Sequence, residues 1–213
     1  MKVKVLEKKD LGFAVIIRLE RPENFEFKAG QHLYLILNNH KKPFSIANTV
    51  EEEGILLYIK IPEEPKDKEF FDLLKRLKEN DEVEIEGPFG RYSADQLLNS
   101  KKIIYIAAGS GITPVRSSVM YLKDKLEQIV FYQEKYENRL IFKKELEKYA
   151  KVIPVLSRDD KTNYFKGYVQ QYLPKYIDKE ATYVIVGPPK FVQEVFKLLL
   201  EKGIKREQIK FAY

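Results

Sequence analysis

Two closely spaced glycines, Gly109 and Gly111, separate an apolar stretch from the start of a segment with helical composition. Glycine at both positions lets the backbone approach an anion closely. We expect Thr113 to cap the following helix and Pro114 to occupy its first position. The free N–H groups and the positive end of that helix would then face a pyrophosphate. The spacing matches neither the complete dinucleotide fingerprint nor the phosphate-loop pattern, so an ordinary tight turn is the alternative.

Three further motifs surround these glycines at domain-sized intervals along the chain. They are Lys42-Pro43-Phe44-Ser45, Gly87-Pro88-Phe89-Gly90 and Val186-Gly187-Pro188-Pro189. An ordinary Gly-x-Gly turn would not need these three accompanying motifs. The ordered set therefore favours a phosphate-binding loop over an isolated turn.

Residues 3–60 have the apolar pattern of β-strands. Apolar side chains alternate in short runs that turn-forming residues separate, at 3–5, 14–19, 33–37 and 55–59. A polar turn is expected at 51–54 and a last strand at 83–85, while the helical spacing of 70–77 predicts a helix that caps the strands. The pattern predicts a β-barrel, with a β-sandwich as the alternative.

From about residue 101 the pattern changes to alternating strands and helices, which is typical of a parallel α/β sheet. Strands are expected at 103–107, 129–132, 152–156 and 182–186. Helices are expected at 113–125, 137–149, 167–173 and 189–202, the last stopped by Gly203. We place the boundary near 99–102, which gives domains of residues 1–99 and 100–213. Ligands of such a sheet bind at the carboxyl ends of its strands, where Gly109 and Gly187 lie.

The composition limits the chemistry that the chain can perform by itself. Among 213 residues there is no cysteine, which excludes disulfides, thiolate catalysis and cysteine-held zinc or iron–sulfur clusters. Two histidines, His32 and His40, make a histidine metal site improbable, so we expect no metal. Any redox chemistry must therefore come from a bound organic cofactor.

The charges are interspersed, with 38 Lys and Arg against 32 Asp and Glu and a net charge of +6. A nucleic-acid-binding arm is therefore not indicated. Abundant Lys and Glu without Cys or Trp suit a thermophile, while a positive face that steers an acidic redox protein is the alternative explanation. The chain has no run of about 18 apolar residues and no signal-like start, so we expect a soluble, cytoplasmic protein with no membrane span.

The ordered motifs resemble those of the ferredoxin–NADP reductase superfamily of flavin oxidoreductases over nearly the full chain. The resemblance implies an N-terminal antiparallel Greek-key β-barrel that binds flavin and a C-terminal parallel α/β, Rossmann-like domain that binds NAD(P). Lys42-Pro43-Phe44-Ser45 looks like the family's Arg-x-Tyr-Ser flavin motif. It implies a cation for the flavin phosphate, an aromatic ring beside the isoalloxazine and, at Ser45, a hydroxyl near flavin N5. A strand start after a turn is the structural alternative.

The later barrel motifs are similar to the family's but incomplete. Ile59-Lys60 and the pair Gly87 and Gly90 match family strands and their closing turn, which implies cofactor contacts there. Family members that hold FAD usually have Gly-x-x-Ser/Thr at the start of the intervening helix, whereas this chain has Lys66-Asp67-Lys68-Glu69-Phe70-Phe71. FAD is favoured as the cofactor, and FMN stays open.

In the second domain, Gly109-Ser110-Gly111 with Thr113 resembles the family's pyrophosphate loop. The resemblance assigns the 2′-phosphate to Ser157 and Arg158, and adenine stacking with added charge to the motif formed by Lys166, Tyr168 and Gln170. A helix cap with a solvated cation is the alternative for the Ser-Arg pair. NADP(H) is therefore favoured over NAD(H).

The end of the chain departs from the family in two positions. Gly187-Pro188 follows Val186, where the family has cysteine, and Ala212 stands where its C-terminal Glu is expected. Tyr213 could stack on the flavin as a terminal aromatic and move before hydride transfer, or could simply pack at a sheet edge. The missing groups leave the rate and the acceptor open, because the cofactor carries the chemistry.

The sequence thus predicts an NAD(P)H-dependent flavoprotein oxidoreductase. Hydride would pass from NADPH to flavin N5, and electrons then to an external acceptor such as ferredoxin or another small, acidic redox protein. One alternative is a flavin reductase that uses exchangeable flavin, and another is an electron-transfer subunit of a larger oxidoreductase. The sequence leaves the acceptor, the direction of electron flow and the oligomeric state open.

Overall fold

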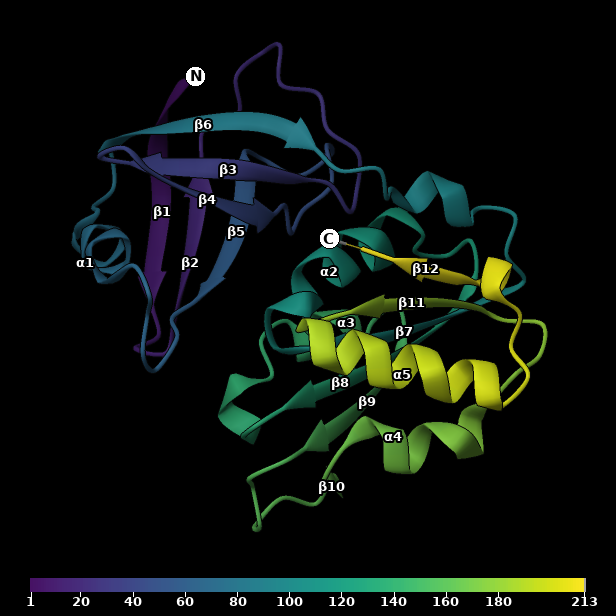
Figure 1. Cartoon of the computed structure of the whole chain (residues 1–213). Helices are drawn as coiled ribbons and strands as arrows, with labels where there is room; N and C mark the ends of the chain where they lie inside the picture. Colours follow the sequence, from purple (N-terminus) through teal and green to yellow (C-terminus); the bar gives the residue numbers. More distant parts are fainter. Residues whose placement is uncertain (213) are drawn as a thin grey trace.

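A computed structural model describes residues 1–212, which form two lobes with one six-stranded sheet each (Figure 1). The first sheet is antiparallel and has the strand order β4-β3-β6-β1-β2-β5. Its elements are β1 (Lys2–Asp10), β2 (Ala14–Leu19), β3 (His32–Leu37), β4 (His40–Ser45), β5 (Ile55–Lys60), α1 (Lys68–Arg76) and β6 (Glu82–Phe89).

The first lobe is barrel-like but not fully closed. Its edge strands β4 and β5 are joined by an isolated bridge between Ile46 and Leu57, within the part of the chain that the structure describes. Alternate residues such as Val3 and Val5 point into a common apolar core, as the period-2 pattern predicts. Helix α1 covers one end of that core with Phe70 and neighbouring apolar side chains, so the expected capping helix is confirmed.

The second sheet is parallel and has the order β10-β9-β8-β7-β11-β12. Its strands are β7 (Lys102–Ala108), β8 (Glu127–Glu134), β9 (Lys151–Leu156), β10 (Phe165–Lys166), β11 (Thr182–Val186) and β12 (Ile209–Phe211). Its helices are α2 (Ile112–Tyr121), α3 (Lys143–Leu146), α4 (Val169–Tyr172) and α5 (Pro189–Glu201). Short 3-10 turns are η1 (Ala94–Leu97), η2 (Gly109–Gly111), η3 (Glu137–Arg139), η4 (Leu173–Tyr176) and η5 (Arg206–Gln208).

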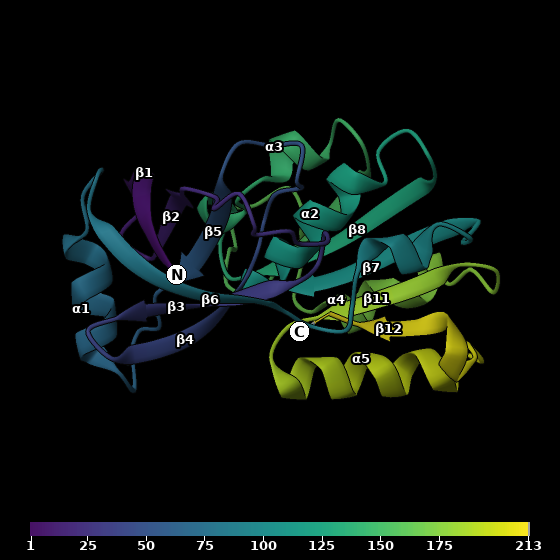
Figure 2. The same ribbon diagram turned by 90° about the horizontal axis from the view of Figure 1, so that it is seen from above.

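Both faces of the parallel sheet are covered by helices. Tyr105 on β7 packs toward α2 and α3, whereas Ile104 and Ile106 pack toward α4 and α5. Figure 2 shows α2 and α3 on one side of the sheet and α5 on the other. Because both faces are dry, these strands are continuous apolar runs, and the expected Rossmann-like architecture is confirmed.

Two helices differ from the expectation. The segment 137–149 is not one helix but η3 followed by the single turn α3, because Phe142 between them has a left-handed backbone with φ of 66°. Helix α2 ends at Tyr121 rather than at residue 125, and Asp124 just beyond it also has a positive φ. Periodicity does not reveal such breaks, since the apolar pattern continues across them.

Candidate functional site

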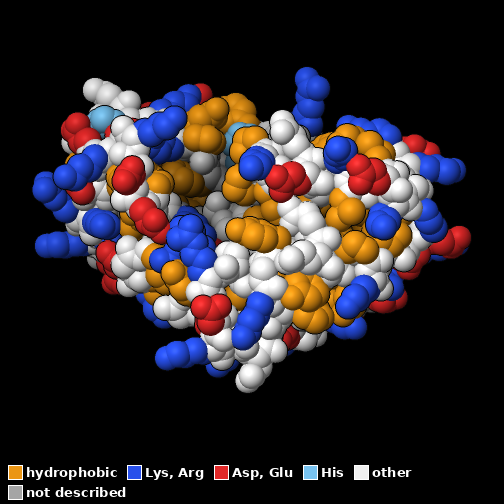
Figure 3. Space-filling model, turned by 60° about the horizontal axis from the view of Figure 1, so that its bottom comes forward, with side chains coloured by type: hydrophobic (Ala, Val, Ile, Leu, Met, Phe, Trp, Pro, Cys, Tyr) orange, Lys and Arg blue, Asp and Glu red, His pale blue; other side chains and the backbone are white. Residues whose placement is uncertain are grey.

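A cleft of about 390 Å³ lies where the carboxyl ends of the parallel strands face the barrel. Figure 3 shows the hollow between the two lobes, with Lys or Arg side chains on its rim. Ser45 and Lys60 enter the cleft from the barrel, and the other lining residues come from the α/β domain: Ala108, Gly109, Ser110, Gly111, Pro114, Val186, Gly187, Pro188 and Ala212. The structure therefore brings together predicted residues from both domains.

The glycine loop continues directly into helix α2. Gly109 has φ of 59°, and a Cβ atom at Gly111 would lie 2.5 Å from the carbonyl oxygen of Val186, so a side chain at Gly111 would displace the backbone. The prediction that Thr113 caps the helix is wrong. Because η2 runs into α2, the N-cap is Gly111, and Pro114 takes the third helical position. Thr113 is buried, and its Oγ1 has no hydrogen-bond partner among residues 1–212.

An ion pair stands beside the glycine loop. Lys60 Nζ lies 2.6 Å from Glu134 Oε1, and a Cβ at Gly109 would lie 3.2 Å from the same ammonium. The Glu134 side chain is only 1% exposed, and its second oxygen accepts the backbone N–H of Lys135. The pair places a cation at the cradle and joins β5 of the barrel to the end of β8. Glu134 was not predicted, because a glutamate at a strand end is usually solvated.

The neighbouring strand positions point away from the cleft. Ile59 is completely buried in the barrel core, so its side chain is not available to a cofactor. Gly87 and Gly90 lie at the end of β6, where Gly90 accepts a hydrogen bond from Gln31, and neither lines the described cleft. These three positions shape the barrel wall rather than the mouth of the site.

The Lys42 motif is already occupied by side chains of the same chain. Lys42 Nζ lies 3.0 Å from Asp67 Oδ2, and Asp67 is the N-cap of α1, where it accepts the N–H of Phe70. His40 Nδ1 approaches the same carboxylate at 3.0 Å. The hydrogen bond from Lys42 is the main reason that the pKa of Asp67 is lowered. The predicted phosphate-binding cation thus contacts an internal anion at a helix N-terminus.

The other members of this motif have separate environments. Phe44 stacks on Phe70 with ring centroids 5.8 Å apart and thereby joins the barrel core. Pro43 lies in β4, an edge strand that tolerates a residue without an N–H. Ser45 ends β4 and alone among the motif lines the described cleft.

A second hollow, of about 620 Å³, lies between α4 and α5 at the end of β8. Tyr168 is 56% exposed there and shares the lining with Phe191 and with Gln170, whose amide donates to Glu194 at 2.8 Å. The predicted adenine-stacking residue therefore stands in an open hollow whose lining also includes polar and charged side chains such as Gln133 and Lys190.

The remaining predicted residues of the second domain lie outside the described lining of this hollow. Lys166 Nζ donates to the carbonyl of Asp160, and Ser157 Oγ donates to the carbonyl of Glu134. Arg158 is exposed at the end of β9. Tyr213, predicted to stack on flavin, lies outside the described residues.

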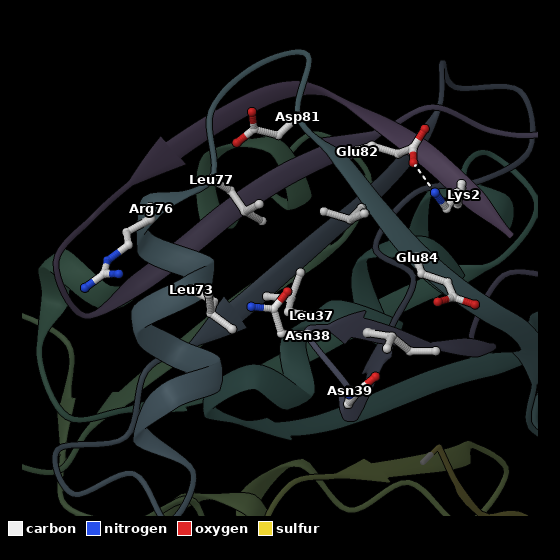
Figure 4. A pocket seen from close by; sticks show the side chains of 12 residues that line it. Lys2, Leu37, Asn38, Asn39, Leu73, Arg76, Leu77, Asp81, Glu82 and Glu84 are labelled. Carbon is white, nitrogen blue, oxygen red and sulfur yellow. Dashed lines mark ion pairs between the residues drawn. The ribbon is translucent and has the colours of Figure 1, made fainter.

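A third hollow lies at the far end of the barrel, between α1 and β6 (Figure 4). It measures about 380 Å³ and combines the apolar side chains of Leu37, Leu73 and Leu77 with an exposed ion pair between Lys2 and Glu82. None of the residues predicted from the motifs lines it in the described structure. Its place in the fold separates it from the interdomain cleft.

The comparisons with known protein families match both lobes. Residues 1–93 match an FAD-binding domain, and residues 105–197 match an oxidoreductase NAD-binding domain. Sulfhydrogenase 1 subunit gamma of Pyrococcus furiosus is 30% identical over 213 aligned positions, which cover 91% of this chain and 71% of the relative. The Na(+)-translocating NADH-quinone reductase of Methylococcus capsulatus has a subunit that is 26% identical, and the match covers 79% of this chain but only 47% of that subunit.

Solved structures share the two-lobed fold. A ferredoxin NADP+ reductase from Neisseria gonorrhoeae with bound FAD and NADP has a TM-score of 0.87 at 19% identity, covering 99% of this chain and 97% of that one. The Amycolatopsis cytochrome P450 reductase GcoB has a TM-score of 0.86 at 20% identity, covering 100% and 69% of the two chains. The fold and the site thus define a two-domain flavin- and nicotinamide-dinucleotide-binding protein. The chain belongs to the ferredoxin–NADP reductase superfamily of flavin oxidoreductases.

Proposed function

We propose that this protein takes hydride from NADPH onto a flavin in the interdomain cleft and passes the electrons to an external acceptor. The observation that carries the proposal is that Ser45 of the barrel and the Gly109–Gly111 cradle line the same cleft. Hydride transfer needs its two reactants within contact distance, and a cleft shared by both domains provides that proximity.

The chain's own residues have distinct roles in this proposal. The N–H groups at the start of α2 bind the pyrophosphate of the dinucleotide, and Lys60, which is paired with Glu134, offers an ammonium donor beside them. Ser45 offers a hydroxyl donor in the cleft, and the buried Ala212 contributes an apolar methyl group to the same lining. A flavin, when bound, accepts the hydride and releases electrons one at a time.

The barrel has residues that suit both the ring and the phosphate of a flavin, although Asp67 already occupies the phosphate position. Ser45 opens onto the cleft. Lys42, together with the N-terminus of α1, already holds an anion, so its donor chemistry suits a phosphate. The Asp67 side chain must move away from Lys42 before a phosphate can bind there. The proposal favours FAD, since residues 1–93 match an FAD-binding domain.

NADPH over NADH is supported by the exposed guanidinium of Arg158, which follows Ser157 at the end of β9. Arginine binds a phosphate monoester through two parallel hydrogen bonds, which NADH would not engage. One relative is named for NADH and a structural neighbour for NADP, so the choice of dinucleotide needs its own measurement.

The composition supports an external acceptor. With no cysteine, the chain has no ligands for an iron–sulfur cluster of its own. The net charge of +6 supports an acidic acceptor protein, since opposite charges accelerate encounter. Two of the relatives are named as subunits, which supports a place for this chain in a larger oxidoreductase. Within residues 1–212, no helix has the length and apolar character needed to cross a bilayer.

The occupied Lys42 supports a second candidate function, a flavin reductase that releases its flavin after each turnover. If Asp67 competes with the flavin phosphate, flavin binds weakly and exchanges. The two candidates differ in whether flavin stays bound through purification and gel filtration.

The test is an anaerobic absorbance spectrum of the purified protein, first after addition of FAD and then after NADPH or NADH. A flavin band that bleaches within the mixing time supports the proposal, and the faster dinucleotide identifies the donor. A protein that binds neither FAD nor FMN, or whose bound flavin is not reduced by either dinucleotide, would refute it. Identification of the flavin in the purified protein distinguishes FAD from FMN.

A further inference from the structure

Three consecutive residues of α2 tie the dinucleotide-binding domain to the barrel. Ser117 Oγ accepts the backbone N–H of Gly30 at 2.9 Å, and Ser118 Oγ lies 3.0 Å from the hydroxyl of Tyr92. Arg116 Nη1 donates to the carbonyl of Ala47 at 2.8 Å. All three α2 residues are buried, so these contacts are shielded from water.

We call the contacts of Arg116, Ser117 and Ser118 with the barrel the seam. Arg116 makes more hydrogen bonds and ion pairs than either serine. Its side chain is only 5% exposed and forms ion pairs with Glu52 at 2.8 Å and with Glu145 at 2.5 Å. Its guanidinium also lies 5.2 Å from the centre of the Phe142 ring. Glu52 belongs to the barrel loop that precedes β5, whereas Glu145 belongs to α3 of the same domain as Arg116. One buried charge therefore binds a carboxylate from each domain.

Arg116 and its partner Ala47 are each only two residues along the chain from a residue that lines the cleft. Ala47 follows Ser45 by two residues, and Arg116 follows Pro114, a lining residue, by two residues. The fork geometry of arginine fixes direction as well as distance. A shift of α2 relative to the barrel would break the contacts with Ala47 and Glu52 but would leave the contact with Glu145 intact.

We propose that Arg116 is a positioning residue that fixes the separation between Ser45 and the dinucleotide cradle through its contacts with Ala47 and Glu52. The proposal rests on the proposed function, because it assigns hydride transfer to the space between these two elements. A misplacement on the order of 1 Å can slow such a reaction by about a hundredfold. Arg116 therefore acts on the rate of flavin reduction rather than on dinucleotide affinity.

The chain offers a matched pair of variants. Glu52→Gln and Glu145→Gln each remove one charge from the same guanidinium with little change in shape, but only Glu52 lies across the domain boundary. Interdomain distance can be read by pulsed spin-label spectroscopy, since the chain has no native cysteine to give background labelling. Labels at Lys9→Cys and Lys148→Cys use exposed positions, one in each domain.

We expect Glu52→Gln to broaden the label-distance distribution and to slow flavin reduction at saturating NADPH by about tenfold, with KM changed less than about threefold. Glu145→Gln should leave the label-distance distribution as in wild type and the rate of flavin reduction within about twofold of wild type. Arg116→Lys, which keeps the charge but loses the fork, should behave like Glu52→Gln and serves if that variant does not fold.

Equal slowing by the two Glu variants, or an unchanged distance distribution in both Glu52→Gln and Arg116→Lys, would overturn the positioning role. The label measurement needs no flavin or dinucleotide. If wild type shows no flavin reduction while Glu52→Gln still broadens the distance distribution, the proposed function fails, but the role of Glu52 and Arg116 in holding the two domains together is supported. If flavin reduction occurs and is insensitive to Glu52 and Arg116, the inference fails and the proposed function stands.

Discussion

Ser45 is a candidate for a direct role in hydride transfer, because its side chain and the Gly109–Gly111 cradle line the same cleft. We expect Ser45→Ala to slow flavin reduction about three- to tenfold without loss of flavin, which is the effect of one lost hydrogen bond. Stopped-flow absorbance under anaerobic conditions measures the rate. Ser100→Ala, on a hydroxyl that bonds Thr182 away from the cleft, is the control. An unchanged rate would contradict the assignment.

Asp67 lets the phosphate site be tested by the choice of flavin. Asp67→Ser keeps an N-cap acceptor for α1 but frees Lys42. We expect FAD and FMN to bind about two- to fivefold more tightly, since a partly exposed ion pair of this kind is worth up to about 1 kcal/mol. Riboflavin, which has no phosphate, should bind as before. Fluorescence titration with the three flavins gives the affinities.

Asp72→Asn is the matched control for Asp67→Ser, because it removes a carboxylate from the same helix at an exposed position. The control should leave all three affinities unchanged. An equal gain for riboflavin, or no gain for FAD, would show that Asp67 does not compete with the flavin phosphate.

Arg158 is expected to select between the two dinucleotides. Arg158→Ala should raise the KM for NADPH about tenfold or more and change the KM for NADH less than about twofold, because only NADPH has the phosphate that a guanidinium binds bidentately. Steady-state assays with each dinucleotide measure this. Lys161→Ala, which removes a nearby exposed cation, is the control for general electrostatics. Equal losses for both dinucleotides would exclude the assignment to the 2′-phosphate.

The cleft residues that could be predicted from sequence carry a local signal. Gly109, Gly111 and Gly187 follow apolar strands, and their position at strand ends is enough to suggest a ligand site. Glu134 and Asp67 carry no such signal. Their roles depend on Lys60 and Lys42, which are brought to them from other segments by the fold.

Among the elements, the turn from η2 into α2 explains why the sequence predicts the wrong N-cap for this helix. Ser or Thr before a helix usually indicates an N-cap, but here Gly109–Gly111 already forms a helical turn, so Thr113 lies inside the helix. The break at Phe142 is similar, because its ring contacts Tyr58 of the barrel. The start of α2 thus follows from a local turn, whereas the break at Phe142 coincides with a tertiary contact.

This turn can be tested by the stability of glycine variants. Gly111 has an ordinary helical φ of −58°, so Gly111→Ala adds no backbone strain, but its Cβ would lie 2.5 Å from the Val186 carbonyl. We expect a loss of roughly 1–3 kcal/mol of unfolding free energy and weaker dinucleotide binding. Gly12→Ala, where φ is 78° and no atom lies within 4 Å, tests backbone strain alone. Urea denaturation compares them, and a Gly111→Ala protein with wild-type stability and dinucleotide affinity would contradict the close packing.

At the scale of the whole molecule, the change from period-2 to alternating strand and helix patterns was enough to predict the barrel-like and parallel sheets. The incomplete closure between β4 and β5 was not predictable, because it depends on how two edge strands meet in space. The division at residues 99 and 100 stays a prediction. The polar seam of Arg116 and its partners was also not predictable, since Glu52 and Arg116 are 64 positions apart.

The seam should make stability depend on pH. Burial raises the pKa of Glu52, but hydrogen bonds from Arg116 and the Thr49 amide outweigh it and leave the pKa below its ordinary value of 4.5. The ionised form is therefore favoured by folding. Its contribution is complete above the ordinary pKa and is lost as the pH falls through the lowered one.

We expect the unfolding free energy of wild type to fall more steeply below pH 4.5 than that of Glu52→Gln, which has no titrating group there. Denaturant unfolding at several pH values measures both slopes. Glu53→Gln removes the neighbouring exposed carboxylate and should keep the wild-type slope. Because Glu52 is bound from the other domain, its protonation weakens the contact between the lobes. Identical acid slopes for wild type and Glu52→Gln would mean that the ion pair with Arg116 does not stabilise the folded molecule.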